Sequence, residues 1–243
     1  MASRAEQKAH TRHLLIDSWL QIIGSGTNFA AISLREVAKT AGVVPTSFYR
    51  HFDDMDELGL AAVDELGLDL RRLMRAPLDA SQPVEGIVRE WVAAYQDYVL
   101  KHADLVQFVN QARTGGTPSL REAIDHELAF FRTRLAGALA EAMPTLMAAD
   151  RETVAEVILA VLVENTNALL ALPARSSARR AELEEGLERR LRVVLLGAAE
   201  LAGSSGRRGG SAGAGKSSGA RSATRSQSKP ATRLKPTRRA SAS

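Results

Sequence analysis

The segment TAGVVPTSFYRHFDD, residues 40–54, decides how the front of this chain folds. Gly42 stands where a helix that ends in a left-handed residue needs a glycine. Pro45 stands where the first turn of a helix tolerates its missing N–H. The segment therefore predicts a helix over residues 34–40, a short turn and a third helix over about residues 45–51. Two short helices joined by such a turn form a helix-turn-helix.

This third helix is predicted to have one buried face and one polar face. Val44, Phe48 and Phe52 repeat every four residues, so we expect them to face the core. A rotation of about 100° per residue then turns the intervening polar side chains outward or to the edge of the buried face. These side chains are Thr46, Ser47, Tyr49, Arg50 and His51.

A face of this kind suits the major groove of double-stranded DNA. An arginine can bond O6 and N7 of guanine together, and a threonine offers a methyl group and a hydroxyl. Serine, tyrosine and histidine are common donors to phosphate. A carboxylate would be repelled by the DNA backbone, and no acidic residue occurs between Val37 and Phe52. The alternative is a solvated face of a small helical domain, but the turn glycine and the charge pattern favour DNA.

The charge distribution also favours a polyanionic partner. The net charge of +4 divides into +3 over residues 1–52, −9 over residues 53–202 and +10 over residues 203–243. The chain has no cysteine, which excludes disulfides and thiolate metal sites. Its polar start lacks the core of a signal peptide, and no apolar run approaches the roughly 20 residues that span a bilayer. We expect a cytoplasmic, nucleoid-associated protein without membrane insertion.

Apolar spacing of three and four recurs along residues 1–202 without strand alternation, which predicts an all-α chain of about nine helices. We expect a three-helix DNA-binding domain at 1–55, a helical ligand-binding and dimerisation bundle at 56–202, and a disordered Gly/Ser/Ala/Arg/Lys tail at 203–243. The predicted helices cover residues 4–24, 34–40, 45–51, 54–75, 84–101, 104–112, 118–141, 150–172 and 178–202.

The string ISLREVAKTAGVVPTSFYRHFDDMDEL resembles the helix-turn-helix of TetR-family transcriptional regulators. With SRAEQKAHTRH before it, the front is similar to the FabR/DesT-like subgroup, which represses genes of unsaturated fatty acid synthesis or desaturation. The resemblance implies a repressor that binds a palindromic operator as a homodimer. Many TetR proteins hold a phosphate with a lysine where this chain has Met55, so that contact is not expected. We expect DNA contacts at Ser33, Arg35, Pro45, Thr46, Ser47, Tyr49, Arg50 and His51.

The middle of the chain concentrates aromatic side chains on several predicted helices. Such a bundle can enclose an apolar ligand, and the resemblance implies a long-chain acyl-CoA or acyl carrier protein thioester as effector, with no cofactor. The alternatives are an ordinary core, or a TetR-type regulator of an unrelated small apolar effector. The residues expected at the effector are Trp91, Tyr95, Phe108, Arg113 and Phe130.

Two further apolar segments, residues 152–163 and 178–202, predict an isologous four-helix dimer interface. The leucine stripe of the second segment is equally compatible with a core inside one chain. The residues expected at the interface are Val157, Val161, Leu183, Leu187, Leu191 and Val194.

Catalytic and metal sites are not expected. Ser47 and His51 stand four residues apart, but no acid lies close in sequence to orient the imidazole. His10 and His13 could share a helix face, but they have no evident carboxylate partner. The second functional hypothesis is also a DNA-binding function. In it, the chain is an architectural nucleoid protein whose basic tail makes the main DNA contacts, while the middle domain only dimerises.

Overall fold

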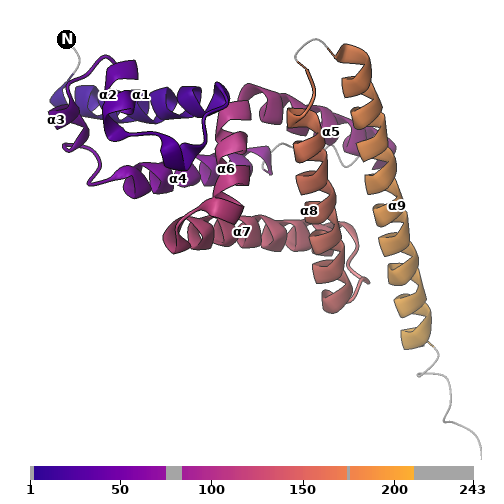
Figure 1. Cartoon of the computed structure of the whole chain (residues 1–243). Coiled ribbons are helices and arrows are strands. Elements are labelled where there is room, and N and C mark those ends of the chain that lie inside the picture. Colours follow the sequence, from indigo (N-terminus) through magenta and orange to yellow (C-terminus); the bar gives the residue numbers. More distant parts are fainter. Residues whose placement is uncertain (1–2, 75–83, 174–175, 211–243) are drawn as a thin grey trace, which may run out of the picture.

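The computed structural model describes residues 3–74, 84–173 and 176–210, and its described residues form nine α-helices and one short 3₁₀ helix (Figure 1). This confirms the all-α prediction. The front contains α1 (Arg4–Gly24), η1 (Phe29–Ala31), α2 (Leu34–Thr40) and α3 (Pro45–Phe48). The remaining helices are α4 (Met55–Leu73), α5 (Val84–Lys101), α6 (Ala103–Gly115), α7 (Pro118–Ala142), α8 (Ala148–Leu170) and α9 (Ser177–Gly210).

Side-chain caps begin the helices of the front. The Ser33 hydroxyl accepts the Glu36 N–H at 3.3 Å, and the Asp54 carboxylate accepts the Glu57 N–H at 2.8 Å. The Glu57 carboxylate accepts the N–H of Asp53 at 2.5 Å, one residue before the position that a capping box predicts. These caps satisfy N–H groups that a helix start leaves without partners, so they locate the starts of α2 and α4.

The turn between α2 and α3 forms as predicted, but α3 is shorter. Gly42 has φ +66°, and the Val43 N–H closes the turn on the Ala38 carbonyl at 2.9 Å. α3 ends at Phe48, and residues 49–51 continue as turns. The prediction that Val44 is buried is wrong, because this residue caps α3 in an extended conformation outside the helical rotation and is 65% exposed.

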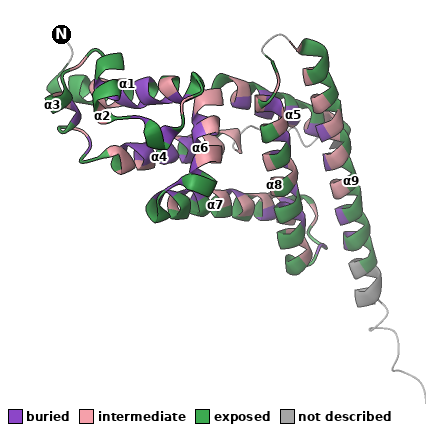
Figure 2. Cartoon of the chain, viewed as in Figure 1, coloured by how far each residue is buried: buried purple, intermediate pink, exposed green. Residues whose placement is uncertain are grey.

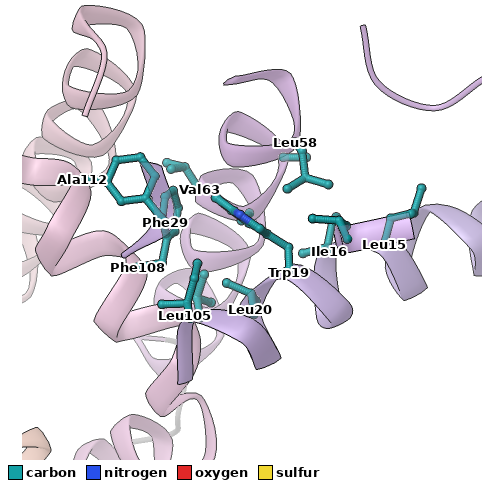
Figure 3. Close-up of a cluster of buried hydrophobic side chains, with 14 of the residues drawn as sticks. Leu15, Ile16, Trp19, Leu20, Phe29, Leu58, Val63, Leu105, Phe108 and Ala112 are labelled. Carbon is teal, nitrogen blue, oxygen red and sulfur yellow. The ribbon is translucent and has the colours of Figure 1, made fainter. Parts of the chain in front are cut away.

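The first of two apolar cores joins the front to α6 and the start of α7. Trp19 of α1 lies at its centre, with its ring centroid 4.6 Å from that of Phe108 and 6.4 Å from that of Phe29 (Figure 3). Truncating a buried ring of this size typically costs about 3–5 kcal/mol. The residues that α6 and α7 contribute are Leu105, Phe108, Val109, Ala112, Leu120 and Ile124.

The second core lies among α5, α7, α8 and α9, and it corrects the predicted dimer interface. Leu187 and Leu191 are buried within this chain, and Val161, Leu183 and Val194 pack half-buried against the same core. The interface prediction is therefore wrong for Leu187 and Leu191. The stripe on α9 faces α5 and α8, and an apolar stripe does not by itself specify its partner.

Two properties of the last helices differ from prediction. α8 is long and apolar enough to cross a membrane by composition, contrary to the expectation for the sequence, although a third of its apolar window is already buried in this fold. α9 continues to Gly210, so the tail does not begin at Gly203. Adding residues to an existing helix does not require the costly first helical turn. The prediction from composition did not take this into account. The rest of the predicted tail, residues 211–243, lies outside the described residues.

Candidate nucleic-acid interface and ligand cavity

The predicted DNA-contact residues lie at the surface of the end of the molecule that carries α3 (Figures 1 and 2). Ser33 and Arg35, at the start of α2, are exposed. Ser47 and His51 are half-buried, because each precedes a phenylalanine, Phe48 or Phe52, that enters the first core. The remaining four are exposed: Pro45, Thr46, Tyr49 and Arg50.

Three residues of this surface were not predicted from the sequence. Lys8 and Arg12 of α1 lie close enough to His51 to act on its charge, and the Arg12 guanidinium lies 4.9 Å from the Phe52 ring centroid. Their spacing of four residues in the basic front was the available signal. Val44 adds an exposed apolar side chain at the start of α3, which is suited to contact with a thymine methyl group.

His51 is a titratable group at the centre of this basic surface. Its Nδ1 atom is buried and has no hydrogen-bond partner. Burial lowers the pKa of His51 below its usual value, and the charges of Lys8, Arg12 and Arg50 lower it further. The free protein therefore carries a neutral imidazole near neutral pH, in a place where a phosphate would favour the imidazolium.

We expect operator affinity to rise as the solution is taken from about pH 8 to about pH 6. A phosphate beside His51 raises its pKa in the complex above that in the free protein. The gain in affinity is therefore complete below the free-protein pKa and is lost as the pH rises through the pKa of the complex. Fluorescence anisotropy with labelled operator measures this slope. His51→Gln should flatten it, whereas the control His10→Gln should not; an unchanged slope in His51→Gln would exclude this residue as the source.

A cavity of about 90 Å³ lies among α4, α5, α6, α7 and α8. Its lining is largely apolar and includes the aromatic side chains Tyr95, Tyr98 and Phe131. The Tyr95 hydroxyl donates to the Leu162 carbonyl at 2.7 Å and lies 2.5 Å from the Thr166 hydroxyl. Burial raises the pKa of Tyr95 to about 12, so this group stays neutral.

Only part of the predicted effector site lines this cavity. Tyr95 and Arg113 do line the cavity, whereas Trp91 stacks on Tyr95 outside the lining and Phe108 belongs to the first core. Phe130 is 38% exposed and lies beneath the Arg71 guanidinium. The cavity is also smaller than the roughly 300–1,000 Å³ typical of ligand pockets. The sequence predicted which helices carry these aromatic residues, but not which helix faces line the cavity.

α6 connects this cavity to the helix-turn-helix. Val106 and Asn110 line the cavity, while Phe108 enters the first core beside Trp19. Two polar contacts reinforce this packing. Gln107 Nε2 donates to the Ile23 carbonyl at 3.3 Å, and Gln111 Oε1 accepts the Phe29 N–H at 3.0 Å.

The start of α7 is also tied to the start of α4. The hydroxyls of Thr117 and Ser119 donate to the two carboxylate oxygens of Asp56, at 2.6 Å and 2.5 Å. Met55, immediately before Asp56, packs against the first core. A displacement of the α6–α7 turn would therefore act on the helix that follows the helix-turn-helix.

Among the described residues, no group of three or more histidine, aspartate or glutamate side chains could hold a metal ion. Residues 26–62, which run from the turn before η1 into α4, match the family of bacterial regulatory proteins, tetR family. The matched segment contains the whole helix-turn-helix and its caps.

The fold resembles solved transcriptional regulators. A tetR-family regulator from Streptomyces coelicolor is 20% identical with a TM-score of 0.64, covering 86% of this chain and 89% of that one. A regulator from Rhodococcus sp. Rha1 is 22% identical with a TM-score of 0.63, covering 77% and 97%. The fatty acid degradation regulator FadR from Bacillus halodurans is 15% identical with a TM-score of 0.60, covering 76% and 94%. At these identities the likeness shows the fold alone.

A helix-turn-helix exposed at one end of a helical bundle is the arrangement found in DNA-binding transcriptional regulators. The particular family that residues 26–62 match is TetR, and the described helices share the fold of solved transcriptional regulators. The FabR/DesT-like subgroup receives no specific support from these comparisons.

Proposed function

We propose that the chain is a ligand-gated repressor, acting in the cytoplasm, that binds a palindromic operator as a homodimer. The observation that carries this proposal is the position of α6, which lines the cavity on one side and completes the core of the front on the other. A ligand that favours one position of α6 would change the separation of the two recognition helices. These must lie about 34 Å apart to enter successive major grooves.

The homodimer is proposed to form through α8 and α9, which pack against each other and keep exposed apolar side chains. Val157 of α8 is 40% exposed. On α9, Val193, Leu196 and Leu201 are 66%, 63% and 44% exposed, at spacings of three to five residues. On the helix surface Val193 lies between Leu196 and Leu201, three and eight residues away. Exposed apolar side chains grouped in this way favour burial against a second copy, in the isologous manner of two-fold dimers.

We propose that the effector is apolar and, more specifically, that it is a long-chain acyl thioester. The apolar lining and the resemblance of the front to fatty-acid repressors support this, although a cavity of about 90 Å³ must enlarge to take a long chain. Calorimetric titration with palmitoyl-CoA and oleoyl-CoA, followed by operator binding with each, tests the proposal. Binding weaker than about 100 μM for both would exclude these thioesters and leave the DNA-binding function intact.

The salt dependence of DNA binding separates this function from the architectural alternative. The C-terminal end of α9 lies far from α3 (Figure 1), yet residues 203–243 carry ten Lys/Arg and no acid. If those cations dominated, affinity would ignore sequence and fall with salt at about −0.9 per neutralised phosphate. We expect salt-tolerant preference for one palindromic site over random DNA of equal length. Equal affinity for both DNAs would favour the architectural protein.

A further inference from the structure

A second cavity of about 130 Å³ lies beside the apolar one, between the C-terminal end of α4 and the middle of α7. Leu70 and Phe131 line both cavities, so these two side chains form the wall between them. The outer cavity differs in its chemistry, because two arginines contribute to its lining. The lining residues are Leu70, Arg71, Met74, Phe130, Phe131 and Arg134.

Arg71 is held in place by two contacts. Its Nη2 atom lies 3.1 Å from each carboxylate oxygen of Glu127, and its guanidinium lies 4.6 Å from the Phe130 ring centroid. Gly67 makes room for this pair, because a Cβ there would collide with the Glu127 carboxylate and lie 2.6 Å from Arg71 Nη1. The guanidinium therefore has a defined position on the wall of the cavity.

Arg134 supplies the charge that is not neutralised. It follows Phe130 by four residues, so both side chains project from one face of α7. Arg134 is exposed, and no described carboxylate forms an ion pair with it. Since Glu127 offsets the charge of Arg71, the described residues that line the outer cavity keep one surplus positive charge. Beside that charge lie Met74 and the exposed part of Phe130.

We propose that the outer cavity binds the carboxylate of a small amphipathic acid. Arg134 is its charge partner, since a guanidinium matches a carboxylate with two parallel hydrogen bonds. The apolar part of the acid passes Leu70 and Phe131 towards the inner cavity. This orientation places the charged group between α4 and α7, rather than at Arg113 of α6 on the inner cavity. The regulatory meaning of the site rests on the proposed ligand-gated function, whereas the binding itself does not.

The test uses calorimetric titration of the full chain with octanoate and with 1-octanol, which differ in the charged group. Octanoate is expected to bind more tightly than octanol. Arg134→Gln should weaken octanoate by about tenfold and leave octanol unchanged. The matched control Arg192→Gln removes an exposed cation from α9, outside the lining of both cavities, and should leave both affinities unchanged. Arg113→Gln on the inner cavity tests the alternative position of the carboxylate, and thermal unfolding of all three variants checks that the fold is intact.

Three results would overturn the site: no octanoate binding at millimolar concentration, equal binding of acid and alcohol, or loss of octanoate in Arg113→Gln instead of Arg134→Gln. Operator binding with and without octanoate separates this proposal from the proposed function. Arg134-dependent binding that leaves operator affinity unchanged supports the site and contradicts gating through it. A shift in operator affinity that survives in Arg134→Gln supports gating and contradicts the site.

Discussion

Replacing Leu196 by arginine is expected to separate the dimer and to weaken operator binding by about a hundredfold or more, while the chain stays folded. Leu196 is 63% exposed on α9, so a charge there is solvated in the monomer and desolvated only in the dimer. Separate protomers also lose the gain of about 10²–10⁴ that comes from engaging two half-sites together. Sedimentation and anisotropy with labelled operator measure the two effects.

Leu187→Arg is the matched contrast on the same helix. Leu187 is fully buried in the second core, so an arginine there would bury an unpaired charge. We expect this variant to unfold or to melt at a much lower temperature, which circular dichroism detects. A Leu196→Arg protein that stays dimeric, or a monomeric one that binds the full operator with native affinity, would contradict the proposed interface.

Arg50→Ala is expected to cost about 1–3 kcal/mol on the specific operator and less on random DNA. Arg50 is exposed just after α3, where Phe48 and Phe52 direct the neighbouring residues away from the first core. Lys101→Ala, which removes an exposed cation from α5 remote from the helix-turn-helix, is the control and should change neither affinity. Competition between operator and random DNA provides the measurement. An equal loss on both DNAs would show that Arg50 contacts phosphate without reading a base.

The sequence predicted the bounds of several helices, because helix caps and turns depend on neighbouring residues. α1 and α5 have the predicted ranges, 4–24 and 84–101, and Gly42 has the positive φ that ends α2. Turns and caps of this kind depend on side chains within a few residues of one another, which a sequence displays directly. The helical rotation of α3 correctly predicted that Phe48 is buried but not that Val44 is exposed, because Val44 caps α3 and its backbone is extended before the helix begins.

Contacts between distant segments were not predictable from the same patterns. Leu187 and Phe108 are apolar residues on amphipathic helices, and their spacing does not tell which helix covers them. Arg71 and Glu127 lie 56 residues apart and meet only because α4 packs on α7. The two cavities exist for the same reason, so their linings could be found only once the helices were assembled.

Two copies of this helix-turn-helix are proposed to read a two-fold symmetric DNA site, with specificity from the surface that α3 presents. The most direct test is selection of bound sequences by the full chain from a pool of random DNA duplexes. The expected result is one enriched palindrome with half-sites about 10 base pairs apart, centre to centre, and loss of that enrichment in Arg50→Ala. Uniform recovery of all sequences, at an affinity that falls steeply with salt, would contradict it.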